Sequence, residues 1–131
     1  MEEGRYFDNS TQKELNELRS GRAGYFRPTY YQVLRAALDA NNNPISWHHS
    51  IVGQSIVAGT PLEPMVVKDG IDGTSLEGAG NSPYAFTNLR VDLHSTQIGV
   101  AVQWWRSVGS THNAFSTETF MEEIAAAAGK D

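Results

Sequence analysis

Two adjacent histidines, His48 and His49, are the most conspicuous potential metal ligands in the sequence. A zinc or transition-metal site needs three or four ligands that converge on one ion. The segment around the two histidines predicts a β-strand, in which adjacent side chains point to opposite faces. The two rings therefore cannot hold one ion together from regular β structure. Only His94 and His112 remain as further histidines, so we expect no native metal site.

Residues for nucleophilic catalysis can also be selected from the chain. The candidates are Ser50 or Ser107 as nucleophile, His94 or His112 as base, and Asp92 as the orienting group. The sequence lacks the Gly-x-Ser-x-Gly pattern of a nucleophile elbow, and a domain of this size contains such sets by chance. An acidic pair, Glu122 and Glu123, falls on a predicted helix surface, where it serves solubility rather than acid–base catalysis.

The run Trp104-Trp105-Arg106 combines two large rings with a cation. In an extended chain the two rings face opposite sides, so we expect one in the core and one at an interface or pocket rim. Arg106 can bind an anion or lie over a ring, although an ion pair with a helix carboxylate is the commoner role. The best anchor for a self-contained catalytic site is a pocket lined by Arg27, Trp105, Arg106 and His112.

Composition excludes several classes of protein. The 131 residues suffice for one domain, and a formal net charge of -5 argues against sequence-independent binding of nucleic acid. Because there is no cysteine, the chain forms no disulfide and ligates no iron–sulfur cluster. No apolar run approaches the length of a membrane span, and the start is acidic. We therefore expect a cytoplasmic protein without membrane contact.

Hydrophobic periodicity predicts a single α+β domain over residues 23–131. Residues 29–39 and 45–53 are rich in aromatic and β-branched side chains and predict a β-hairpin. Residues 88–94 alternate between apolar and polar side chains and predict a further strand, and residues 98–105 are apolar and extended. The expected architecture is a small mixed or antiparallel sheet with one long C-terminal helix packed on it.

The two ends of the chain differ in character. Near the C-terminus an apolar stripe predicts the long helix, with Thr111 or Asn113 as its cap and Gly129 at its end. Residues 1–22 are polar and predict a loosely attached arm, with a short helix over residues 12–19.

A series of short motifs points to a known family. The most specific is Trp104–Gly109, followed by Phe120–Ala125 on the predicted helix. The other motifs are Tyr25–Pro28, Leu38–Ala40, Ile51–Ile56, Ala58–Pro61, Val67–Gly70, Glu77–Ala79, Pro83–Ala85 and Asn88–Val91. In order and spacing they resemble the large subunit of molybdenum hydroxylases, the xanthine dehydrogenase and aldehyde oxidase family. The greatest similarity is to the isoquinoline 1-oxidoreductase beta-subunit type, and the arm shows no match.

This resemblance implies a cofactor and a reaction. The family binds molybdopterin, usually as the cytosine dinucleotide in bacteria, and hydroxylates N-heterocycles or aldehydes with oxygen from water. Electrons leave through iron–sulfur clusters on a small subunit, and the chemistry belongs to the cofactor. By resemblance, Arg27 and Val108 would contact substrate. The residues that would contact the cofactor are Trp105, Arg106, Ser107, Val108 and Gly109.

The resemblance also implies that parts of the site lie elsewhere. The family's general base and its glycine-rich phosphate loops have no counterpart in these 131 residues. We therefore expect a fragment-like relative with no catalytic residue of its own, which does not hold the cofactor alone and whose partners include the remaining hydroxylase subunits.

Two alternatives remain open. The first is an oligomeric binding or assembly module that reuses the fold, and the second is a small independent enzyme at the pocket described above. For the first, a homo-oligomer is expected because a piece of a larger domain exposes apolar surface. Its candidate interfaces are the hairpin's free strand edge and the side chains of Ile98, Val100, Val102, Trp104 and Trp105.

Overall fold

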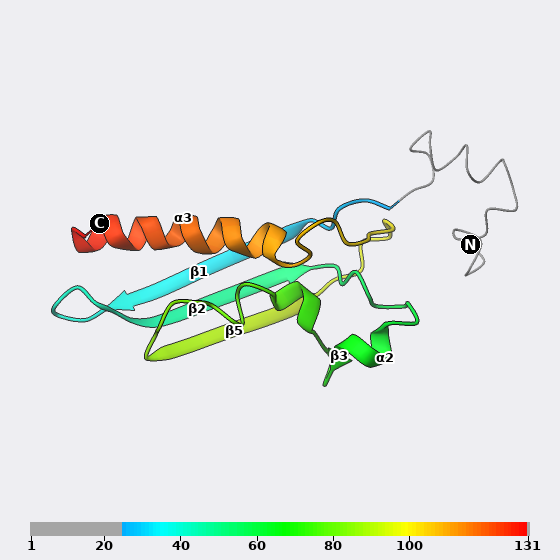
Figure 1. The fold of residues 1–131 in the computed structure, drawn as a ribbon, viewed down its shortest axis with the longest axis horizontal. Helices are drawn as coiled ribbons and strands as arrows, with labels where there is room; N and C mark the ends of the chain where they lie inside the picture. Colours follow the sequence, from blue (N-terminus) through cyan, green and yellow to red (C-terminus); the bar gives the residue numbers. More distant parts are fainter. Residues whose placement is uncertain (1–24, 131) are drawn as a thin grey trace, which may run out of the picture.

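A computed structural model describes residues 25–130, which form a three-stranded sheet with a long helix along one face (Figure 1). Strands β1 (Tyr30–Leu38) and β2 (Pro44–Gly53) form an antiparallel hairpin. Strand β5 (Asn88–Ser95) pairs with β2 in parallel, which gives the order β1-β2-β5. Helix α3 (Ser110–Ala128) packs against β1. The α+β class, the hairpin, the later strand and the C-terminal helix are therefore confirmed.

Other expectations were wrong or fall outside the described part. The predicted arm of residues 1–22 and its helix lie outside the described residues. Residues 98–105 do not form a strand, since only Val102 makes a bridge, with Phe26. In residues 25–130, no helix is both long and apolar enough to cross a membrane.

The hairpin turn is tied to the far end of α3. Asp39 accepts the backbone N–H of Asn43 at 2.8 Å, and Asn42 adopts a left-handed φ of 60° that asparagine tolerates. The Asn42 side chain donates to the carbonyl of Ala128 at 3.3 Å, and Lys130 donates to Asn43 Oδ1 at 2.8 Å. These contacts fix the direction of the helix along the sheet.

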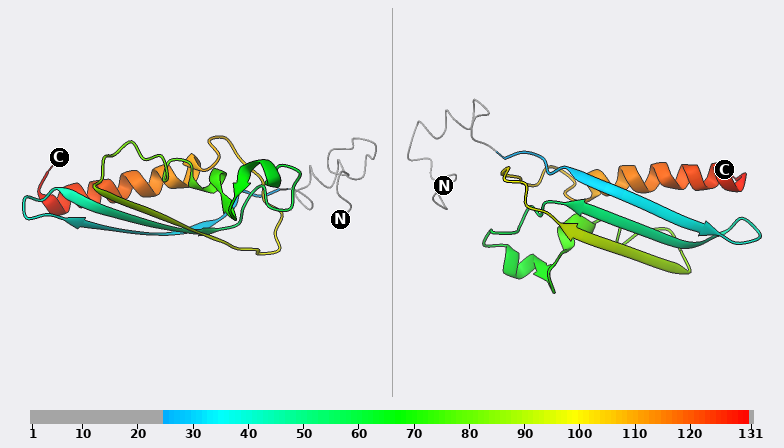
Figure 2. Two further views of the ribbon diagram at one scale, coloured as in Figure 1. Left: turned by 90° about the horizontal axis from the view of Figure 1, so that it is seen from below. Right: turned by 180° about the vertical axis from the view of Figure 1, so that it is seen from behind.

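The two faces of the sheet differ because side chains alternate along each strand. Trp47, His49 and Ile51 of β2 are buried on the face that carries α3. Trp47 stacks on Phe86 with ring centroids 4.9 Å apart and meets the edge of Phe120 at 5.2 Å. Figure 2 shows that α3 and the connections between strands lie on this face, whereas no described element covers the opposite face.

The part of the chain that connects β2 to β5 contains several short elements, which fill one end of the molecule. A small apolar cluster of Ile56, Val57 and Val102 is buried there. The elements are helix α2 (Glu63–Val66), strands β3 (Val67–Lys68) and β4 (Ile71–Asp72), and the 3-10 helix η1 (Gly73–Leu76). They form the base on which the segment before α3 rests.

Candidate functional site

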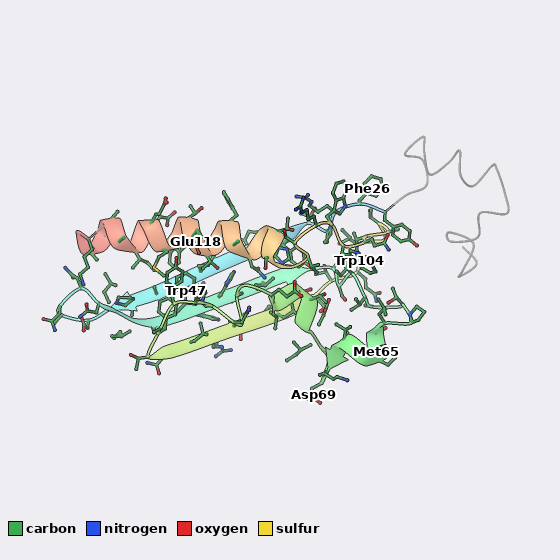
Figure 3. All side chains as sticks on the ribbon, viewed as in Figure 1. Phe26, Trp47, Met65, Asp69, Trp104 and Glu118 are labelled. Carbon is green, nitrogen blue, oxygen red and sulfur yellow. The ribbon has the colours of Figure 1, made fainter. Side chains whose placement is uncertain are left out.

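The segment Trp104–Gly109, here called the 104–109 loop, joins the bridge at Val102 to the start of α3. Trp104 and Trp105 are 48% and 52% exposed, so the expectation that one of them lies in the core was wrong. Alternation of faces requires a strand, and among residues 25–130 no strand pairing extends beyond Gln103, whose N–H donates to the carbonyl of Phe26 at 3.1 Å. Both rings are thereby exposed, and Figure 3 shows Trp104 at one end of the molecule, close to Phe26.

The backbone of the 104–109 loop is strained. Ser107 has a φ of 73° and Val108 a φ of 42°, and a left-handed β-branched residue is a rare outlier. The turn is closed by two hydrogen bonds, from Val108 N–H to the Trp105 carbonyl at 3.0 Å and from Thr111 Oγ1 to the Arg106 carbonyl at 2.8 Å. Strain of this kind persists where the surrounding structure enforces it, and it is enriched at functional sites.

Gly109 holds the loop against η1. A Cβ at this position would lie 2.0 Å from the carbonyl oxygen of Thr74, so only glycine fits. Its N–H donates to Glu77 Oε2 at 3.2 Å. Gly109 is also the N-cap residue of α3, without a side-chain capping bond. The expected cap at Thr111 or Asn113 was therefore wrong, because the close contact with Thr74 places the start of the helix earlier.

A small cavity lies behind the loop. The guanidinium of Arg27 sits 5.1 Å from the centre of the Trp105 ring, and His112 stacks on Tyr30 with centroids 3.6 Å apart. Arg27, Trp105 and His112 line the cavity, whereas Arg106 does not. Three of the four predicted pocket residues are thus brought together. The cavity volume of about 30 Å³ has room for water but not for a substrate.

Buried hydrogen bonds anchor the floor of this cavity. Asp72 is 1% exposed and accepts from Ser55 Oγ at 2.7 Å, Ser75 Oγ at 3.1 Å and the Thr74 N–H at 2.8 Å. Ser75 Oγ also lies 3.0 Å from the Tyr30 hydroxyl, and desolvation is the main cause that raises the pKa of this tyrosine. Both carboxylate oxygens of Asp72 are occupied, so Asp72 is a structural anchor and not an available base.

A second buried chain of amides reaches from the sheet to α3. His49 Nε2 lies 2.8 Å from Gln32 Oε1, and Gln32 Nε2 donates to Asn113 Oδ1 at 3.1 Å. Asn113 Nδ2 donates to the carbonyls of Ser75 and Glu77, both at 2.9 Å. This role of Asn113 was not predicted from the sequence, which indicated only a helix cap. A buried asparagine in the first turn of the helix fastens α3, and with it the 104–109 loop, to η1.

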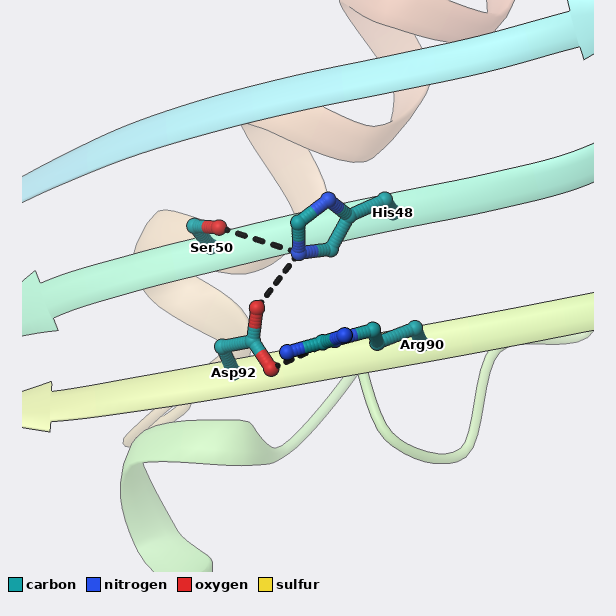
Figure 4. Close-up of polar contacts among 4 residues, drawn as sticks. All are labelled: His48, Ser50, Arg90 and Asp92. Carbon is teal, nitrogen blue, oxygen red and sulfur yellow. Dashed lines mark hydrogen bonds and ion pairs between the residues drawn. The ribbon is translucent and has the colours of Figure 1, made fainter.

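A polar cluster occupies the open face of the sheet (Figure 4). Ser50 Oγ lies 3.2 Å from His48 Nε2, and Asp92 Oδ2 contacts the same nitrogen. Arg90 Nε donates to Asp92 Oδ1 at 2.9 Å. Hydrogen bonds from His48 and Arg90 lower the pKa of Asp92.

This geometry does not form a catalytic triad. In a triad the nucleophile and the carboxylate bind opposite ring nitrogens, whereas here both contact one nitrogen. Asp92 pairs with His48 and not with His94 or His112, and Ser107 lies in the 104–109 loop. The serine–histidine–aspartate sets that can be selected from the sequence are therefore not assembled among the described residues.

The two adjacent histidines lie on opposite faces, as predicted. His49 is fully buried beneath α3, whereas His48 lies in the cluster on the open face. Among the described residues, no group of three or more histidine, aspartate or glutamate side chains is placed to bind a metal ion. Glu122 and Glu123 are exposed on α3, as expected.

Comparison of the chain with family models, with curated proteins and with solved structures found no match.

Proposed function

We propose that this chain is a fragment-like relative of a molybdenum hydroxylase large subunit. In this proposal the 104–109 loop forms one wall of a molybdopterin site that other polypeptide completes, and the chain has no activity alone. One observation carries it: the loop that bears the most specific motif is exposed and strained, and it is anchored from behind by Gly109 and Asn113. Anchored strain with exposed aromatic rings is typical of a ligand-contacting loop.

The loop fits an edge contact with a large anionic cofactor. Within residues 25–130 the Arg106 guanidinium makes no ion pair, so it is available for an anion. The cavity behind the loop does not admit the cofactor, and contact would therefore be from the exposed side. The residues that would hold molybdopterin are Trp105, Arg106, Ser107, Val108 and Gly109.

When bound, a molybdopterin centre supplies the hydroxylation of an N-heterocycle or an aldehyde with oxygen from water. The residues of this chain would orient the reacting groups. Arg27 is held over Trp105, where its charge can stabilise developing negative charge on substrate. Val108 packs partly against the cluster of Ile56 and Val57, so its contact with substrate stays a prediction. No carboxylate lines the cavity, which supports a general base supplied from outside the described residues.

A complementation experiment tests this function. A large subunit of the isoquinoline 1-oxidoreductase type, lacking the segment that this chain resembles, is co-expressed with its small subunit and with the chain. We expect molybdenum in the purified complex and restored heterocycle hydroxylation, with neither for the chain alone. Hydroxylation with stoichiometric molybdenum in the chain alone would contradict the proposal, as would a folded chain that restores no activity.

Two arginine variants test the role of Arg106 in the same experiment. Arg106→Ala should lower the restored activity at least about tenfold, because a charge-assisted contact to the cofactor is lost. Arg35→Ala, on an exposed residue of β1, is the matched control and should retain activity. Equal activity of the two variants would show that Arg106 does not contact the cofactor.

A second candidate function is an assembly module, favoured by the apolar surface around the 104–109 loop. Phe26, which lies close to Trp104 (Figure 3), is 53% exposed, and Ile98 and Val100 in the segment that leads to the loop are 54% and 43% exposed. A grouping of large exposed side chains marks an interaction surface. In the complementation experiment Trp104→Ser should weaken binding to the truncated subunit, whereas self-association lost through this variant would favour the module. Cytoplasmic location stays a prediction under both functions.

A further inference from the structure

Strand β5 is an edge of the three-stranded sheet. Its inner side pairs with β2, and no described segment pairs with its outer side. The strand is eight residues long, its Leu89 is 43% exposed, and the Arg90 side chain is 73% exposed. A long edge strand with exposed apolar side chains is a template for another strand.

We propose that β5 pairs with β5 of a second copy of this chain, in an antiparallel arrangement centred on Val91. A strand that meets its own copy across a two-fold axis must run antiparallel to it. The two three-stranded sheets would then join into one continuous sheet. This surface is separate from the 104–109 loop, so the inference does not depend on the proposed function.

The residue order of β5 is self-complementary about Val91. With Val91 at the two-fold axis, Arg90 lies opposite Asp92 of the partner subunit, and this pair occurs twice. Leu89 lies opposite Leu93 of the partner subunit on the other face. Opposite charges and apolar pairs facing across strands both stabilise a sheet.

Other registers are less favourable. Centring on Arg90 places two arginines opposite each other, and centring on Asp92 places two carboxylates opposite each other, both of which destabilise pairing. If the two-fold axis lay between two residues, each side chain would face one from the opposite face of the partner strand. The apolar face of one sheet would then continue the polar face of the other. Among registers centred within residues 90–92, charge and face together therefore select the one centred on Val91, which also keeps more of β5 paired than a centre nearer either end of the strand.

The charged residues are already placed for this contact. Asp92 is held on the open face by His48 and by Arg90 Nε at 2.9 Å. A carboxylate has about four acceptor positions and a guanidinium has five donors. Asp92 can thus accept from the partner subunit's Arg90 without losing its present contacts.

Cross-linking tests the register directly, because the chain contains no cysteine. In the Val91→Cys variant the two thiols would meet at the axis, where facing Cα atoms of a sheet lie about 4.5 to 5.5 Å apart, within disulfide range. Under mild oxidation we expect a covalent dimer at micromolar concentration. Leu89→Cys is the control, since its thiol would face Leu93 of the partner subunit. Equal cross-linking of the two variants, or none with Val91→Cys, would overturn the proposal.

Charge reversal tests the interface without a covalent bond. By sedimentation, Arg90→Asp should weaken the dimer at least about tenfold, because two carboxylates then face each other at each pair. The double variant R90D/D92R should restore the dimer to within about threefold, because the pairs are complementary again. Arg35→Asp makes the same charge change on the other edge strand and should dimerise normally. Circular dichroism verifies that each variant is folded.

Each remaining outcome of these experiments contradicts the proposal. A wild-type chain that stays monomeric at 100-fold higher concentration than the cross-linking experiment would exclude it. Loss of the dimer with Trp104→Ser but not with Arg90→Asp would place the contact at the 104–109 loop. Loss with Arg35→Asp would place it at β1. Restored hydroxylation without dimerisation would refute this inference and leave the proposed function standing.

Discussion

At the scale of single residues, the neighbours His48 and His49 have different environments. His48 lies on the open face and contacts Asp92, whereas His49 is fully buried. Burial is the main cause that lowers the pKa of His49 to about 4, with smaller contributions from His112 and His48. Its Nδ1 atom is buried without a hydrogen-bond partner. Protonation would place a charged, unpaired N–H in the core, so His49 is neutral in the folded chain.

This environment predicts a pH-dependent stability. Between about pH 6.5 and pH 4 the unfolded chain protonates His49 and the folded chain does not, so the free energy of unfolding falls as pH falls. For a pKa lowered to about 4, the loss across this window is about 3 kcal/mol. Urea denaturation at several pH values measures it. His112, whose pKa burial also lowers, would add a change of the same sign.

Substitution of His49 measures how much this residue contributes to the pH dependence of stability. His49→Gln keeps a donor toward Gln32 and has no titratable ring, so stability should depend less on pH between 6.5 and 4. His94→Gln removes an exposed histidine and is the matched control, and His49→Gln should reduce the pH dependence more than this control does. A steep slope retained in His49→Gln would show that His49 is not the titrating group.

At the scale of elements, the 104–109 loop depends on how α3 begins. Gly109 lies against Thr74 of η1, and Asn113 bonds to two carbonyls at the C-terminal end of the same short helix. The loop is therefore positioned by the packing of Gly109 and Asn113 on η1, together with the contact of the Val108 side chain with the cluster of Ile56 and Val57. Its strained conformation should be lost when this packing is disturbed.

A glycine substitution tests this dependence. Gly109→Ala would force its Cβ onto the Thr74 carbonyl and should lower the free energy of unfolding by at least about 2 kcal/mol. Gly73→Ala, where a Cβ meets nothing within 4 Å, should change it by less than about 0.5 kcal/mol. Thermal unfolding of both variants measures the difference, and equal stabilities would show that Gly109 tolerates a side chain.

The elements differ in how far the sequence predicts them. The hairpin, β5 and α3 follow from local periodicity, which reports on each segment by itself. The parallel pairing of β2 with β5 depends on residues more than forty positions apart along the chain, so no local pattern encodes it. Trp104 and Trp105 misled the alternation rule because they lie outside any strand of the described residues, beyond the bridge at Val102. Asn113 looked like a cap because its carbonyl partners, Ser75 and Glu77, are distant in sequence.

At the scale of the whole molecule, residues 25–130 form a single layer of three-stranded sheet with one covering helix. No described element covers the other face of the sheet, and the 104–109 loop, which carries two exposed tryptophans, lies at one end (Figure 1). Uncovered sheet and exposed rings are typical of a chain that meets other polypeptide. In our account the two surfaces have separate partners, a second copy at β5 and the remainder of a hydroxylase at the loop.

Hydrogen exchange of the chain, alone and with the truncated hydroxylase subunit, measures whether the 104–109 loop is covered by a partner. If the 104–109 loop forms one wall of a shared site, its amides should exchange at least about tenfold more slowly in the complex. The amides of the hairpin turn at residues 39–43 should exchange at the same rate in both samples. Protection of the turn with an unchanged 104–109 loop would contradict the account.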